Sequence, residues 1–398
     1  MLNLLPVPVY GAESPSDRWI VVHAGTLLAV PGMPAIRKHS IIIRGDRIDS
    51  LQPGYIEPRS IHNEAELLDL SSVFVLPGLI DVQNHFTAEM GQAPRLLRKV
   101  TQNDADVALN GAWFAGRTLL AGFTTVRDMG DSGLAMFALR EAIAAGTVPG
   151  PRMQAAGQII GPELGGAAYR AEIENILPRN GHCAGADECR RAVREQVRRG
   201  ADTIKVYLNH DLLPQTRPYF TPAELNAMVE AAHELGRKIT ASAFGTGPIN
   251  AALRAGVDGI VHGVFLDEES IRLFLLTGAF FIPTLNAAET VREMALDSAM
   301  PVSDTWRQEN LEIHRAMTAG FTRAHKAGVR IAFGTDAGWR QHGDNAEQFL
   351  HLVAGGMNET EAIITATVNA AAAMGWSERV GTLEPGKYAD FIAVPASP

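Results

Sequence analysis

Short apolar segments alternate with amphipathic stretches over most of this 398-residue chain, and this alternation constrains the fold more than any other feature. The amphipathic stretches repeat apolar residues at helical spacing, for example over residues 188–200 and 223–236. Strands that alternate with helices form a parallel sheet, and eight such units predict an α/β fold of the (β/α)8 TIM-like barrel type. The eight candidate strands are residues 73–82, 123–129, 152–160, 203–209, 238–244, 259–264, 280–285 and 330–337.

The boundaries of the predicted helices are marked by capping residues. The run from Thr221 to Glu224 has the capping-box pattern, with proline at the first helical position, and predicts a helix start. Glycine is favoured just past a helix end, where a left-handed conformation closes the last turn. Such glycines follow seven predicted helices, at Gly122, Gly146, Gly200, Gly236, Gly256, Gly278 and Gly328.

The two ends of the chain differ from its middle. Residues 18–75 alternate apolar and polar residues in short runs punctuated by glycine and proline, which is typical of a small β-rich unit. Residues 377–398 have the same pattern and are predicted to join that unit as one small β-sandwich domain, beside a barrel of residues 76–376. Residues 1–17 are interpreted as an N-terminal arm or the remnant of an export signal, and both interpretations remain open.

Composition limits the partners that the chain can have. The net charge is −9 and lysine and arginine form no long run, so we expect no binding to nucleic acid. No apolar run approaches the roughly 20 residues that span a bilayer, so we expect no membrane partner. The expected partner is a small-molecule substrate. The only cysteines, Cys183 and Cys189, predict a local disulfide, which favours an exported or periplasmic location over a cytoplasmic one.

Polar residues at the ends of the predicted strands indicate where chemistry takes place. Reactive groups of such barrels lie at the C-terminal ends of the strands. A charged group inside a barrel must be paired or bound to a metal. The candidate groups at these ends are Gln83, His85, Lys205, His262 and Asp336.

Several stretches resemble motifs of the amidohydrolase superfamily: LPGLIDVQNH, GADTIKVY, AGVDGIVHG, FGTDAG and VGTLEPGKYADFIAV. Two more, AGFTTVRDMG and CRRAVREQVRRGADTIKV, are similar to the imidazolonepropionase-like and Xaa-Pro or Xaa-Arg dipeptidase groups in particular. The resemblance covers nearly the whole chain. It implies a barrel whose strand-end divalent metals activate water for attack on an amide or related carbonyl, and it implies a homo-oligomer.

The resemblance assigns a role to four of the strand-end residues. His85 matches the second residue of the family's His-x-His pair, and His262 matches the metal ligand on the sixth strand. Lys205 matches the lysine that is carboxylated and bridges the metals. Asp336 matches the metal ligand that also acts as the catalytic general acid/base.

Two imidazoles of the family's metal site are replaced in this chain. Gln83 stands for the first histidine of the pair, and Ser242 stands for the histidine of the fifth strand, as a space-filling residue rather than a nucleophile. The remaining ligands predict a degenerate site with one divalent metal, zinc by expectation, or none, and Gln83 would be a weak fourth ligand. Phe244 occupies a position that is polar in many relatives and predicts an apolar pocket.

Three kinds of function therefore remain open. The first is a mononuclear hydrolase of a C–N bond (amide, peptide-like or lactam), with Asp336 as general acid/base and Lys205 carboxylated. The second is a metal-free cyclase, lyase, isomerase or decarboxylase, in which unmodified Lys205 pairs with Asp336. The third is a non-catalytic ligand-binding protein. Substrate contacts are predicted for Tyr207, His210, Ser242, Phe244 and His342.

Overall fold

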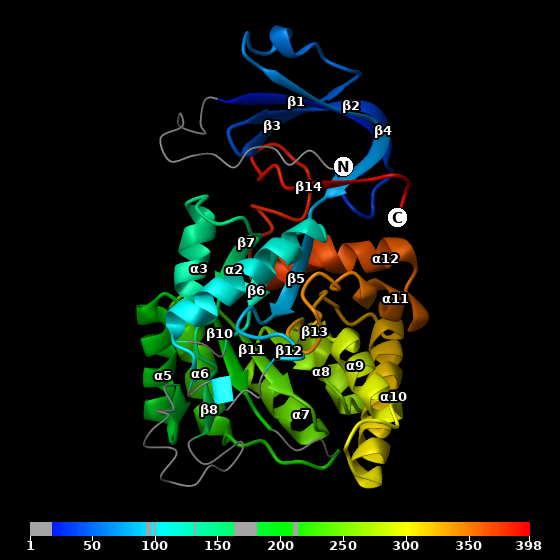
Figure 1. The fold of residues 1–398 in the computed structure, drawn as a ribbon. Helices are drawn as coiled ribbons and strands as arrows, with labels where there is room; N and C mark the ends of the chain where they lie inside the picture. Colours follow the sequence, from blue (N-terminus) through cyan, green and yellow to red (C-terminus); the bar gives the residue numbers. More distant parts are fainter. Residues whose placement is uncertain (1–17, 93–96, 99–100, 131–132, 163–180, 210–213) are drawn as a thin grey trace.

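The computed structural model describes residues 18–92, 97–98, 101–130, 133–162, 181–209 and 214–398. The arm or signal remnant predicted for residues 1–17 lies outside the described residues. The described chain is an α/β protein in which a small β-sheet stands at one end of a larger portion built of parallel strands and helices (Figure 1). Over the described ranges, no helix is long and apolar enough to cross a membrane.

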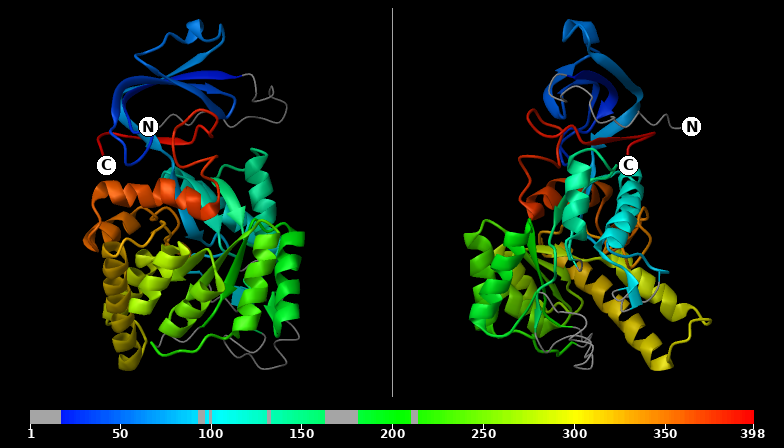
Figure 2. Two further views of the ribbon diagram at one scale, coloured as in Figure 1. Left: turned by 180° about the vertical axis from the view of Figure 1, so that it is seen from behind. Right: turned by 60° about the vertical axis from the view of Figure 1, so that its left-hand side comes forward.

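The small sheet contains strands from both ends of the chain, in the order β14-β4-β1-β2-β3. Its bounds are Trp19–Leu27 for β1, Ile36–Arg44 for β2, Arg47–Pro53 for β3, Glu66–Pro77 for β4 and Phe391–Val394 for β14, with a 3-10 turn at Pro58–Ser60. The strand β14 pairs antiparallel with β4, and β4 pairs parallel with β1. The prediction was a small β-sandwich; these strands form one hydrogen-bonded sheet, which is curled (Figure 2). The curled sheet encloses a cluster of apolar side chains.

Parallel strands form the centre of the larger portion, as predicted. One sheet contains β5 (Leu79–Asn84), β6 (Phe123–Asp128) and β7 (Arg152–Ala155), and another contains β10 (Thr203–Tyr207), β11 (Lys238–Ala243), β12 (Gly259–His262) and β13 (Phe280–Ile282). The two-residue strands β8 (Gly161–Pro162) and β9 (His182–Cys183) pair with each other. Isolated parallel bridges join Ile160 to Val206, Phe281 to Ile331 and Asn84 to Ala337.

Two predicted strands differ from the observed ones. Residues 73–82 are divided between β4 and β5, because the chain passes from one sheet to the other at Gly78. Only glycine fits there, since a Cβ would lie 2.0 Å from Thr124 Oγ1. Residues 330–337 form isolated bridges and no regular strand, because the backbone N–H of Phe333 donates to Thr365 and the φ of Asp336 is 61°.

Helices surround the parallel strands (Figures 1 and 2). Thr221 and Glu224 form the predicted capping box at the start of α6, and all seven predicted helix-end glycines have positive φ. The helices are α2 (Asp104–Leu120), α3 (Ala135–Ala144), α5 (Ala186–Arg199), α6 (Pro222–Glu234), α7 (Thr246–Ala255), α8 (Glu268–Thr277), α9 (Leu285–Leu296), α10 (Asp304–Lys326), α11 (Glu347–Ala354), α12 (Glu359–Ile364) and α13 (Ala370–Met374), with a π-helical turn at Thr365–Asn369.

A buried arginine fastens the last helix to the parallel strands. Arg127 on β6 donates from Nε to the carbonyl of Val82 and from Nη1 to the carbonyl of Ala373 in α13. Burial lowers the pKa of Arg127 to about 10. The guanidinium therefore stays charged at neutral pH and holds α13 to β5 and β6.

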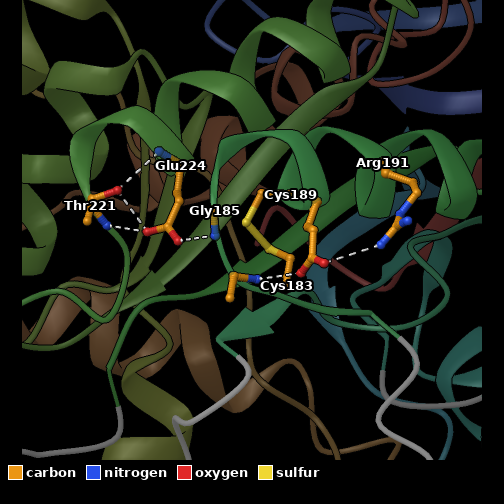
Figure 3. Close-up of a disulfide and its surroundings, with 8 residues drawn as sticks. Cys183, Gly185, Cys189, Arg191, Thr221 and Glu224 are labelled. Carbon is orange, nitrogen blue, oxygen red and sulfur yellow. Dashed lines mark hydrogen bonds and ion pairs between the residues drawn. A yellow bond between two sulfur atoms is a disulfide. The ribbon is translucent and has the colours of Figure 1, made fainter.

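Cys183 and Cys189 form the predicted disulfide (Figure 3). It joins β9 to the first turn of α5, and the backbone N–H of Gly185, between the two cysteines, donates to Glu224 Oε1 at 2.6 Å. Glu224 is also the residue that completes the capping box of α6. The disulfide loop thus ties together the starts of two neighbouring helices.

Replacing Cys183 and Cys189 together with serine is expected to lower the free energy of unfolding by about 2 kcal/mol, because the bond closes a short loop in the unfolded chain. Urea denaturation followed by circular dichroism measures the change. Wild-type protein in reductant should have the same denaturation midpoint as the variant, whereas the midpoint of the variant should not change with reductant. A wild-type midpoint that is unchanged by reductant would contradict the expectation.

Candidate active site

Four of the predicted site residues meet at the C-terminal ends of the parallel strands. Gln83 Nε2 lies 2.9 Å from both Asp336 Oδ1 and His85 Nε2. Lys205 Nζ donates to Gln83 Oε1 at 3.0 Å, and His85 Nε2 lies 3.2 Å from Asp336 Oδ1. We call Gln83, His85, Lys205 and Asp336 the strand-end cluster. In the metal-free alternative considered for the sequence, unmodified Lys205 pairs directly with Asp336. Between these two described residues the link instead runs through the side chain of Gln83.

Gln83 and Asp336 are in contact through their backbones as well as through their side chains. The N–H of Asp336 donates to the carbonyl of Gln83 at 2.8 Å. Two residues earlier, Gly334 allows the segments to approach, since a Cβ there would lie 2.5 Å from Ile282 Cγ2 and 2.8 Å from Gln83 Cβ. Glycine at this position is therefore a requirement of the close packing beneath the cluster.

A buried carboxylate fixes the same two segments to each other. Asp81 Oδ1 accepts from the backbone N–H groups of Gln83 and Thr335, and Oδ2 accepts from Thr335 Oγ1 and Asn345 Nδ2. Burial raises the pKa of Asp81 to about 6, although these hydrogen bonds act to lower it. Asp81 thereby sets the register in which Gln83 and Asp336 face each other.

Backbone strain is concentrated where the strands end. His262, Thr284 and Asp336 have φ values of 69°, 46° and 61°, in the left-handed region that side chains disfavour. Over the described ranges, only Lys38 shares this property among residues other than glycine. Such strain persists where the surrounding structure imposes it, and it is typical of functional sites.

Burial and neighbouring groups lower the pKa values of both Lys205 and Asp336, for different reasons. Burial lowers the pKa of Lys205 to about 7, and the positive charge of Arg127 acts in the same direction, against the attraction of Asp336. Burial acts to raise the pKa of Asp336, but the hydrogen bonds from His85 and Gln83 and the charge of His85 hold it well below its usual range. Asp336 is therefore ionised at neutral pH, and Lys205 titrates near neutrality.

The two histidines have opposite pKa shifts. Burial lowers the pKa of His262 to about 4, helped by the positive charges of Lys205 and His85, so His262 is neutral. Burial also acts to lower the pKa of His85, but its hydrogen bond to Asp336 and the charge of that carboxylate outweigh burial and raise it. The side chain of His85 is 18% exposed and that of Asp336 is 7% exposed, so the cluster is reached from the His85 side.

An aromatic wall stands beside the cluster. Phe244 stacks on the ring of His262 with centroids 4.6 Å apart, and Tyr207 lies 6.1 Å from Phe244. Ser242, on β11 and paired with Tyr207 of β10, is buried. The wall consists of Tyr207, Phe244 and His262, and it occupies the part of the site where the family resemblance implies a metal ligand on the fifth strand.

Two more residues were predicted to contact substrate, His210 and His342. His210 lies outside the described residues. His342 is fully buried, stacks on Phe114 with centroids 4.6 Å apart and has Nε2 3.0 Å from the carbonyl oxygen of Ala88. It therefore fastens the loop after residues 330–337 to the loop after β5, because its ring fits between apolar side chains.

Three residues that position the histidines were not identified from the sequence. Thr284 Oγ1 lies 2.9 Å from His262 Nδ1. The carbonyl of Gly130 lies 3.0 Å from His85 Nδ1, so this nitrogen carries a proton, and Asp128 accepts from the backbone N–H of Gly130. The available signal was that Asp128 and Thr284 lie near the C-terminal ends of predicted strands, at the same edge as the residues that were identified.

The donor set of the cluster does not fit the divalent metal that the family resemblance implies. His85 Nε2 and Asp336 Oδ1 are the best ligand atoms, and the amide nitrogen of Gln83 is hydrogen-bonded to both. An amide N–H donor cannot bind a cation, and the oxygen of Gln83 faces Lys205. Over the described ranges, no three His, Cys, Asp or Glu residues are grouped as a metal site would need.

Comparison with known proteins gives one family. The model of the Amidohydrolase family matches residues 74–397. Ochratoxinase of Aspergillus niger is 28% identical over 419 aligned residues, which cover 100% of this chain and 85% of that protein.

Solved structures give the same result. A Xaa-Pro dipeptidase with bound methionine superposes with a TM-score of 0.85 at 33% identity, over 96% of this chain and 94% of that one. The A. niger ochratoxinase structure superposes with a TM-score of 0.83 at 26% identity, over 96% and 90% of the two chains.

Thr284→Val is expected to destabilise the protein by about 1 kcal/mol relative to Thr284→Ser, because only serine keeps the hydroxyl that bonds His262 Nδ1. Urea denaturation of the two variants measures the difference. Equal stabilities would show that the hydroxyl does not hold His262.

Proposed function

We propose that this chain, which belongs to the Amidohydrolase family, hydrolyses a C–N bond of an amide, a peptide-like compound or a lactam in a small molecule. The observation that carries the proposal is the ionised, buried carboxylate of Asp336, which the side chain of Gln83 joins to Lys205. A carboxylate that accepts a proton and a lysine that donates one are together sufficient for general acid–base catalysis with water.

The proposed reaction uses the side chains of the cluster alone. Asp336 takes a proton from a water molecule as the water oxygen attacks the carbonyl carbon of the substrate. The ammonium group of Lys205 has three N–H donors, of which one is bound to Gln83, and another donates to the carbonyl oxygen as negative charge develops there. When the C–N bond breaks, the proton on Asp336 passes to the leaving nitrogen.

We also propose that the parallel strands close into the (β/α)8 barrel typical of this family. Three bridges support closure: Ile160 with Val206, Phe281 with Ile331, and Asn84 with Ala337. They connect β7 to β10 through residues 156–160, and β13 to β5 through residues 330–337. Closure would direct the side chains of Gln83, Lys205 and Asp336 toward one axis.

Asp336→Asn is expected to reduce hydrolysis by about 10²- to 10⁴-fold, because an amide cannot accept the proton of water. The assay is release of amine from a panel of N-acyl amino acids, dipeptides including Xaa-Pro, lactams and ochratoxin. Asp304→Asn, the same chemical change at an exposed helix start, should leave the rate unchanged. Wild-type activity in Asp336→Asn would refute the assigned role of this carboxylate.

The link from Lys205 through Gln83 to Asp336 also favours a second candidate function, a metal-free cyclase, isomerase, lyase or decarboxylase. The same acid–base pair can move a proton at carbon without consuming water. Reaction in water labelled with oxygen-18 distinguishes the two functions, because hydrolysis places one label in the carboxyl product. A rearrangement or decarboxylation does not.

We propose that the substrate presents an apolar or aromatic group to the wall of Tyr207, Phe244 and His262. Phe244→Ala is then expected to raise the KM for aryl-bearing substrates about tenfold, since the contact with the ring is lost. Phe244→Tyr, which keeps the ring, should preserve the KM. Faster turnover of acyl-amino acids by Phe244→His or Phe244→Tyr would contradict an apolar substrate.

A further inference from the structure

We infer that the carboxamide of Gln83 takes the place of the metal ion in this chain, and that the strand-end cluster operates without a divalent metal and with Lys205 unmodified. The inference deepens the proposed function, because it concerns the same cluster. It predicts the zinc content of the protein and the chemical state of Lys205, and both can be measured without any substrate.

The orientation of the Gln83 amide is fixed by the charges around it. Its oxygen accepts from Lys205, and its nitrogen donates to Asp336 and faces His85. Turning the amide over would direct N–H groups at an ammonium ion and an oxygen at a carboxylate, so both contacts would become repulsive. The opposite signs of Lys205 and Asp336 therefore select one of the two orientations.

This orientation fills the position that a metal would need. The amide nitrogen lies between two ligand atoms, 2.9 Å from Asp336 Oδ1, to which it donates, and 2.9 Å from His85 Nε2. A metal bound to these two atoms would have to displace the amide nitrogen and would gain only a poor third ligand.

Burial disfavours carboxylation of Lys205. A carbamate keeps one N–H on Nζ that still donates to Gln83 Oε1, but its carboxylate would replace the positive charge of the lysine with a negative charge close to Asp336. The lysine is 1% exposed, so water could not relieve the repulsion between the two negative charges.

Zinc content tests the inference directly. Purified wild-type protein is incubated with excess zinc, desalted and analysed by inductively coupled plasma mass spectrometry. Gln83→His/Ser242→His, which restores both missing imidazoles, serves as the positive comparison, and Ser242→Ala, which keeps the amide bridge, serves as the matched control. We expect at most about a tenth of a zinc per chain in wild type and Ser242→Ala, and about one in the double variant.

A second measurement reports on the lysine. Protein equilibrated with carbon-13 bicarbonate should give no carbamate signal by NMR in wild type, and one signal in the zinc-loaded double variant that is lost when Lys205→Met is added. Circular dichroism confirms that each variant is folded. A full equivalent of zinc or a carbamate signal in wild type, or a folded double variant that gains no zinc, would overturn the inference.

These outcomes are separable from the proposed hydrolysis. Wild-type protein that holds no zinc and also turns over none of the substrate panel would leave the inference intact while removing the proposed function. Protein that holds zinc and hydrolyses amides would overturn the inference while supporting the proposed function.

Discussion

The active-site end of this molecule depends on the contact between β5 and residues 330–337, which a buried carboxylate reinforces. Asp81 receives hydrogen bonds from the backbone at Gln83 and from the backbone and side chain of Thr335. It also receives one from Asn345, beyond the segment. Two stretches that are about 250 residues apart in the chain are therefore aligned by this side chain together with the backbone hydrogen bond from Asp336 to Gln83, and the positions of the cluster residues follow from that alignment.

Within the cluster, the hydrogen bonds of the Gln83 amide stabilise the acidic side chain in place of a cation. A divalent metal neutralises acidic ligands by charge, whereas an amide does so by presenting donors on one side and an acceptor on the other. Gln83 is suited to this because a lysine and an aspartate flank it with opposite charges. The glutamine that stands at position 83 in place of a histidine therefore contacts Lys205, His85 and Asp336 through its amide group.

The sequence alone predicted much of the fold and that Gln83, His85, Lys205 and Asp336 lie at the same edge, but not the hydrogen bonds that connect them. Lys205 and Asp336 were identified because charged residues within buried strands need a partner. The direction of the Gln83 amide could not be predicted, because it depends on two charges brought together only by folding. His342 was misplaced because its packing against Phe114 follows from the path of two loops. Residues 330–337 departed from a regular strand because part of their hydrogen bonding goes to residue Thr365.

The pairing of β14 with β4 has a consequence for the order in which the molecule is assembled. The edge of β4 that receives residues 391–394 is synthesised more than 300 residues before its partner. A ribosome adds about 5–20 residues each second, so this edge is open for at least about 15 seconds. An unpaired strand edge is a template for association between chains. The nascent chain thus carries an unpaired strand edge until residues 391–394 emerge, and chaperone protection of this edge would prevent association between chains.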